Sequence, residues 1–320
     1  SSFRMNLLFW IKIKKKFSLT ISLKEFKNIF LVLISVMIPI VLSQTIYQIG
    51  YTIDDYMFAN ILGKKGLAEI VVTNLQGVFN TQYTQLINLP VGMATAFGMS
   101  VIPRITTSYT RGEKNNVDDN IGQIIKMTSM VVFPTVIGMT ICSEEIMTVL
   151  FPGLGELRGL AINLLKWGSM AAAFYSFSTV STAILQGCNR FKTPVINSGI
   201  ALVTHIVIVY LLLKFTDMNA YALLIGDIIF PMTILILNMG IIIKKIRPHV
   251  KANNIVKPLV GAIEMGIIVF CVKDIMTLYS MNLKLRFVIE VGVGVITYGI
   301  CNRKFILDFF ANSSIGKNKS

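Results

Sequence analysis

The sequence predicts an all-α protein, a polytopic transmembrane helix bundle with about eight spans. Three observations support this prediction. The 320 residues are 54% hydrophobic and only 14% charged, whereas soluble proteins carry about 25% charged residues. Apolar runs near the roughly 20 residues needed to cross the hydrocarbon core recur along the chain. Basic residues gather between these runs, at positions 12–16, 244–251 and 302–304.

The first two spans are expected at residues 29–58 and 76–105. The first contains Pro39 and the second Pro90, and each proline removes a backbone hydrogen bond and can kink its helix. The remaining spans are expected at residues 121–141, 160–185, 195–215, 220–243, 258–272 and 287–301.

Three further segments lie outside the spans. Residues 104–122 are polar and rich in Asn and Asp, which predicts a solvated connection. Residues 143–159 mix apolar and acidic side chains before Pro152, which indicates a short amphipathic segment at the outer interface followed by a turn. The polar stretch 311–320 is expected to be disordered.

The net charge of +14 does not indicate nucleic-acid binding, because the cations flank apolar runs instead of forming one solvated basic face. Eight alternating spans with both termini in the cytoplasm satisfy the positive-inside rule. The outer segments then keep only a minority of the cations: Lys64, Lys65, Arg158, Lys214, Lys273, Lys284 and Arg286.

The sequence carries no enzyme signature, such as GxSxG, HExxH or a glycine-rich phosphate loop. The four cysteines are far apart and form no CxxC pair, so neither a metal site nor a disulfide framework is predicted, and no cofactor is expected. His205 lies inside the fifth span without an acidic neighbour in the sequence. A proton relay is one interpretation, but a packed, hydrogen-bonded histidine is favoured.

Polar side chains crowd the outer halves of the first two spans. An ionisable group at membrane depth is costly unless it faces a cavity or a partner, and Asp54 and Asp55 point about 100° apart on a helix. We therefore expect the two polar halves to line one water-accessible cavity. The predicted cavity residues are Gln44, Gln48, Asp54, Asp55, Asn80, Gln85 and Asn88, with Arg104 near the inner mouth. In the alternative interpretation, the Asp pair is a solvated helix end and Arg104 only anchors its helix at the lipid surface.

The stretch QLINLPVGMATAFGMSVIPRITTSYTRGE resembles a helix of flippases in the multidrug/oligosaccharidyl-lipid/polysaccharide superfamily, especially the stage V sporulation protein B and lipid II flippase branches. Its matching residues are Leu86, Asn88, Pro90, Thr95, Ala96, Ser100, Pro103 and Arg104. The segments FPTVIGM (133–139), IMTVLFPG (146–153) and LQGCNRFKTPVIN (185–197) match in order, so the resemblance extends over nearly the whole chain. Many relatives of the sporulation branch also carry an Asp where Asp54 and Asp55 stand.

The resemblance implies a second six-helix lobe at residues 29–243 and two additional transmembrane helices at 244–303. A basic cytoplasmic linker (1–28) precedes them and a polar tail (304–320) follows. It also implies a missing N-terminal lobe, which agrees with a chain that opens without Met. In the lipid II branch an acidic–basic pair precedes the proline of the second span. Thr84 and Gln85 stand there instead, which favours a broader polysaccharide-export function.

The function that follows is transport across the plasma membrane of a bacterium. The leading hypothesis is a flippase that moves a lipid-linked oligosaccharide or cell-wall precursor from the inner to the outer leaflet, with membrane lipids and the lipid-linked sugar as partners. The alternative is a cation-coupled multidrug antiporter of the same superfamily, with Asp54, Asp55, Asp227 or Glu264 binding the coupling ion. A non-transporting membrane scaffold is the third possibility.

Overall fold

The computed structural model describes residues 23–303, 305 and 307. The predicted disordered stretch 311–320 and most of the basic linker therefore lie outside the described residues. The chain divides into two compact units, residues 1–42 and 43–320, each of which is described by itself.

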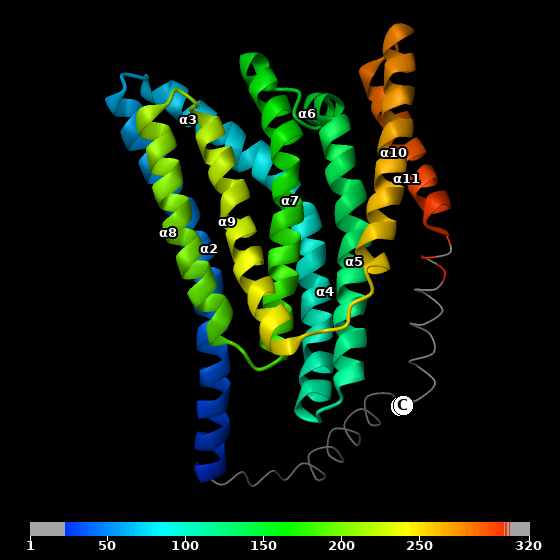
Figure 1. The fold of residues 1–320 in the computed structure, drawn as a ribbon. Helices are drawn as coiled ribbons and strands as arrows, with labels where there is room; N and C mark the ends of the chain where they lie inside the picture. Colours follow the sequence, from blue (N-terminus) through cyan, green and yellow to red (C-terminus); the bar gives the residue numbers. More distant parts are fainter. Residues whose placement is uncertain (1–22, 304, 306, 308–320) are drawn as a thin grey trace, which may run out of the picture. The chain divides into compact units, whose positions relative to one another are not determined.

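All regular secondary structure in the described part of the chain is helical, which confirms the predicted all-α fold (Figure 1). The α-helices are α2 (Leu23–Lys64), α3 (Glu69–Gly77), α4 (Thr84–Thr110), α5 (Lys114–Ile141), α6 (Ser143–Leu150), α7 (Arg158–Gly187), α8 (Lys192–Phe215), α9 (Ala220–Ile241), α10 (Asn253–Leu278) and α11 (Leu283–Cys301). Two π-helical segments, η1 (Val78–Tyr83) and η3 (Ile242–Ile246), and one 3-10 turn, η2 (Gly155–Leu157), complete them.

Each predicted span falls within one of these helices or within a continuous helical stretch. Among the described residues, five stretches are long and apolar enough to cross a membrane: Glu69–Thr110, Lys114–Ile141, Lys192–Phe215, Ala220–Ile246 and Asn253–Leu278. The chain is thus a multi-pass helical membrane protein, and the count of eight spans stays a prediction.

Unit 1 consists, in its described part, of the first turns of α2. The helix begins at Leu23, inside the stretch assigned to the linker from the sequence, and continues through Pro39 into unit 2.

Unit 2 is built around α7, which contacts α4, α5 and α9 (Figure 1). Buried small residues along α7, including Gly168, Ala171, Ala172 and Ser176, let these neighbours approach closely. Helix α8 packs on α9, and α10 packs on α5 and α11.

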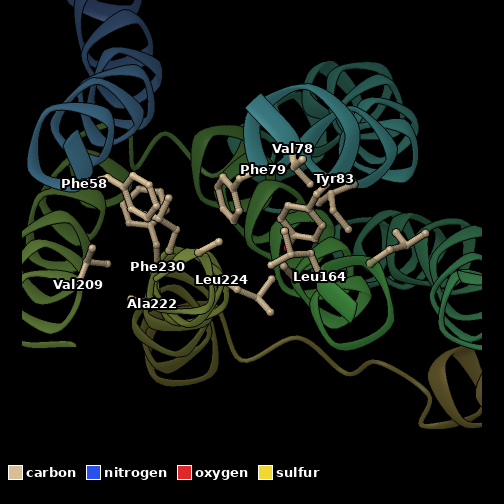
Figure 2. Close-up of a cluster of buried hydrophobic side chains, with 14 of the residues drawn as sticks. Phe58, Val78, Phe79, Tyr83, Leu164, Val209, Ala222, Leu224 and Phe230 are labelled. Atoms are coloured by element: carbon tan, nitrogen blue, oxygen red, sulfur yellow. The ribbon is translucent and has the colours of Figure 1, made fainter. Parts of the chain in front are cut away.

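The largest apolar core lies among α2, η1, α7, α8 and α9 (Figure 2). Phe58 of α2, Tyr83 of η1 and Leu164 of α7 are completely buried in it, and Val209 and Phe230 bring in α8 and α9. This core holds the C-terminal half of α2 and the π-helical turn in place, and both carry the polar groups of the candidate site.

The connection predicted at residues 104–122 is mostly exposed, as a solvated segment should be, but it is largely helical. Helix α4 continues to Thr110 and α5 already begins at Lys114, so only a short turn separates them. Threonine hydroxyls donate to the carbonyl oxygen four residues earlier, at 2.7–2.9 Å for Thr106, Thr107 and Thr110, and their side chains are thereby satisfied within the helix.

The short amphipathic segment predicted at residues 143–159 is present as α6 followed by a turn. Its Glu145 is completely buried and forms ion pairs with Arg286 of α11 and with Lys273 of α10, whose Nζ lies 2.8 Å from Oε2. This charged cluster connects α10 and α11 to α6.

Candidate functional site

A buried, hydrogen-bonded Asp–His pair joins α2 to α8. His205 Nε2 lies 2.8 and 2.9 Å from the two carboxylate oxygens of Asp54, and the residues are only 4% and 8% exposed. The favoured interpretation of His205 as a packed, hydrogen-bonded histidine is confirmed, and its acidic partner is distant in the sequence. Because α2 and α8 meet within the apolar core, two ionisable residues that lie 151 positions apart become neighbours.

The other ring nitrogen determines how many protons the pair holds. His205 Nδ1 lies 2.9 Å from the carbonyl oxygen of Gly226, which can only accept, so Nδ1 carries a proton. An ionised Asp54 also only accepts, so the Nε2 contact requires one further proton, either on the ring or on the carboxyl group. The pair in this arrangement therefore holds a proton that an isolated imidazole and carboxylate would not.

Gly226 makes the second contact possible. A Cβ atom at this position would lie 2.3 Å from Val209 Cγ2 and 2.8 Å from His205 Cε1. Only glycine lets the backbone of α9 approach the imidazole this closely.

The next residue, Asp227, forms the second buried group. Its carboxylate accepts hydrogen bonds of 2.8 Å from the hydroxyl groups of Tyr83 and Tyr175, and its exposed fraction is 6%. Tyr51 reaches the Tyr175 hydroxyl at 3.5 Å, which links this group back to α2. Two hydroxyl donors replace the hydration of a carboxylate and allow it to remain in the core.

A small cavity connects the two groups. It is lined by aromatic and acidic residues and a glycine: Tyr47, Gly50, Tyr51, Asp54, Tyr175, His205, Asp227 and Phe230. About 10 Å³ is open to the centre of a water molecule, which is about the space that one bound water requires. The cavity can thus hold a water between the proton-binding pair and Asp227.

Asp55 points away from the core that Asp54 enters. It is exposed, and its Oδ1 accepts hydrogen bonds from Asn80 at 2.8 Å and from Gln76 at 3.3 Å. Gln76 Nε2 also donates to the Asp55 carbonyl oxygen at 2.9 Å. The helix continues to Lys64, so the alternative that the Asp pair ends its helix is wrong.

The other predicted cavity residues lie on the exposed polar face, which we define as Gln44, Gln48, Asp55, Asn80, Gln85 and Asn88. The hydrogen bonds of Asp55 join the α2 and η1 parts of this face. Asp54 does not belong to it, because its side chain is turned into the core. That the predicted residues line a substrate cavity stays a prediction.

Arg104 lies away from both groups. It is 16 residues beyond Asn88 on α4, about 24 Å along the helix. There it lines a surface concavity of about 500 Å³ together with Thr107, Arg111 and Asn116.

Sequence reasoning missed the tyrosines and the role of His205. Tyr51, Tyr83 and Tyr175 read as ordinary aromatic residues of apolar helices. One signal was available: an ionisable residue inside a span requires a partner, and Asp54, His205 and Asp227 were three such residues without assigned partners.

Comparison with known proteins matches the chain to one family and to two curated relatives. The MatE family model matches residues 39–211, more than half of the chain. The chain is 28% identical over 190 residues to the lipid II flippase MurJ of Bacillus subtilis, covering 59% of this chain and 35% of that protein. It is 21% identical over 183 residues to a probable lipid II flippase MurJ of Bdellovibrio bacteriovorus, covering 54% and 34%.

A solved structure, the lipid II flippase MurJ in an inward closed conformation, has the same fold. It aligns with a TM-score of 0.62 at 18% sequence identity, and the alignment covers 95% of this chain and 60% of the solved chain. The chain therefore spans about a third of the length of these curated relatives in sequence alignment and three fifths of the solved one in structure. From the extent of the family match, the chain belongs to the MatE family of the multidrug/oligosaccharidyl-lipid/polysaccharide superfamily.

Proposed function

We propose that this chain is the second lobe of a flippase that carries a lipid-linked sugar or cell-wall precursor from the inner to the outer leaflet of a bacterial plasma membrane. In this proposal both termini are cytoplasmic and a first lobe completes the transporter. Transport moves the substrate without chemical change.

The observation that carries the proposal is the exposed polar face. Six polar residues of α2, η1 and α4 are exposed, although the chain is a membrane protein. Such groups are costly against lipid, so a water-filled cavity or a polar partner is expected to cover them. A polar headgroup crossing about 30 Å of hydrocarbon needs such a surface.

The chemistry of this face suits the sugar part of a substrate. It presents five amide side chains and one carboxylate, Asp55, and none of the six residues is cationic. Amides and carboxylates hydrogen-bond to sugar hydroxyl groups, whereas a carboxylate repels a pyrophosphate. The cations that meet the phosphates would then come from the first lobe.

The test is complementation by the full-length protein in cells depleted of their own flippase. We expect rescue by the wild type and loss of rescue by Asp55→Asn/Asn80→Ala at equal abundance. Glu156→Gln, which changes an exposed carboxylate in η2, is the matched control and keeps activity. No rescue by a correctly inserted wild-type protein would refute the proposal.

The geometry of the face can be tested separately. Asp55→Cys, in a variant whose exposed Cys271 and Cys301 are serine, should react from the outside with a membrane-impermeant thiol reagent, and substrate should block the reaction. Labelling that substrate never affects would remove Asp55 from the transport path.

One observation favours a second candidate, the cation-coupled multidrug antiporter. The hydrogen bonds of the Asp54–His205 pair require a shared proton, and a proton-coupled antiporter needs a proton-binding acidic residue. Proton-dependent dye efflux that is lost in Asp54→Asn would support this candidate. The lipid II flippases among the relatives favour the flippase.

A further inference from the structure

A second cavity system lies away from the polar groups, at the end of the lobe where α9 passes into α10. A groove of about 520 Å³ opens beneath the loop from Arg247 to Ala252. Its walls are mainly aliphatic and come from α5, α7, α9, η3 and α10: Ile121, Ile125, Ile184, Met239, Ile242 and Ile255.

The groove continues into a second apolar cavity of about 230 Å³, which is farther from the 247–252 loop but no more enclosed than the groove. The two share Ile125, Ile184, Met239 and Ile255, so they form one trough. The second cavity ends at Phe133, eight residues along α5 from Ile125, which corresponds to about 12 Å.

The second cavity offers nothing to a polar ligand. Its single hydroxyl residue, Ser181, already donates to the Ser178 carbonyl oxygen at 2.7 Å and accepts from Asn238 at 2.9 Å. An apolar chain is therefore the occupant that fits it.

Cations surround the open end. The cations Arg247 and Lys251 line the groove together with the imidazole of His249, all three are exposed, and Lys244 and Lys245 of η3 lie just before them in the chain. From α5, Asp118 faces this end, with Oδ2 at 3.5 Å from His249 Nδ1. One carboxylate among these cations leaves the mouth of the trough positively charged.

We propose that the trough binds an anionic membrane phospholipid, with its phosphate at Arg247 and Lys251 and an acyl chain between α5, α7 and α9. Basic pockets between transmembrane helices are a usual site for anionic lipid headgroups. A soluble phosphate would leave the apolar trough unoccupied. A zwitterionic lipid would place its own cation among Arg247, His249 and Lys251.

The source of selectivity follows from the surroundings. A lipid tail that moves from the bilayer into the trough exchanges one apolar environment for another and gains little. Preference for this site must therefore come from the headgroup, so anionic and zwitterionic lipids with the same chains should be distinguished.

The experiment is native mass spectrometry of the full chain in detergent with phosphatidylglycerol or phosphatidylcholine of equal chain length. We expect roughly tenfold tighter retention of phosphatidylglycerol, from two cations near one phosphate. Arg247→Gln/Lys251→Gln should abolish the preference. The control Lys64→Gln/Lys284→Gln removes two exposed cations that lie outside the trough and should keep it.

A second variant separates the trough from its mouth. Leu235→Trp fills the second cavity and should reduce retention of both lipids while circular dichroism remains unchanged. Equal retention of the two lipids by the wild type, or an unchanged preference in the cation variant, would overturn the proposal. Full displacement of phosphatidylglycerol by an equimolar amount of inorganic phosphate would indicate a site for phosphate alone, and displacement by undecaprenol, which carries no phosphate, would assign the trough to a substrate tail. Either outcome would also overturn it.

Discussion

The buried Asp54–His205 pair predicts that Asp54→Asn hardly changes the stability of the fold, whereas His205→Leu lowers it strongly. In Asp54→Asn, the histidine keeps its Nδ1 proton for the Gly226 carbonyl oxygen, and the new amide donates to an unprotonated Nε2. The number of hydrogen bonds is retained and one proton is lost. A charge-assisted bond becomes a neutral one, which should cost about 1 kcal/mol of unfolding free energy.

His205→Leu is expected to be much worse. It leaves the Asp54 carboxylate, at 8% exposure, without its imidazole partner. Breaking one side of a buried ion pair costs about 3–5 kcal/mol. Asp54→Leu/His205→Leu removes both members and should be less destabilised than His205→Leu alone, because no buried charge is left unpaired.

The assay is thermal unfolding of the purified protein in detergent. We expect the midpoint to fall in the order wild type, Asp54→Asn, the double leucine variant, His205→Leu, with the last lowered by roughly 10 °C. Lys64→Leu is the control, since the Lys64 side chain is exposed, and it should change little. If His205→Leu proves as stable as Asp54→Asn, the buried charged pair is not what holds α2 against α8.

Three further predictions concern the same packing. Gly226→Ala should destabilise by about 1–3 kcal/mol through its contacts with Val209 and His205, whereas Gly199→Ala, with open space at its Cβ, should not; both are read as unfolding midpoints. Arg286→Leu removes one of the two cations paired with Glu145 and should lower the free energy of unfolding by about 3–5 kcal/mol. It should also expose the α10–α11 hairpin to protease, whereas Lys284→Leu should not. Equal proteolysis of the two variants would contradict the role of the cluster. Burial raises the pKa of the Cys188 thiol to about 11, so a maleimide at pH 7.5 should label it far more slowly than an introduced exposed cysteine such as Asp55→Cys; equal rates would show that the end of α7 opens.

The helices could be predicted from the sequence because apolar length alone determines which segments cross a membrane. The existence of α2, α5, α8 and α9 follows from runs that could not be solvated. The ends of α4 and α5 could not be predicted, since threonines and asparagines leave the choice between helix and loop to local hydrogen bonding.

Part of the candidate site could likewise be predicted from the sequence, and part of it could not. Helical spacing predicted that Asp54 and Asp55 diverge, because that depends on neighbouring residues only. The partners of Asp54 and Asp227 come from other helices, at separations of 151, 144 and 52 residues, and no local pattern encodes such pairings.

The π-helical turn η1 has a mechanical consequence. Within six residues it points Asn80 outward to Asp55 and Tyr83 inward to Asp227. A π-helix holds its residues at a wider winding than an α-helix, so rewinding the segment would rotate these two side chains against each other. The exposed polar face and the buried carboxylate are thus linked through one short segment. A change in the winding of η1 would move Asn80 and Tyr83 together and so affect both groups.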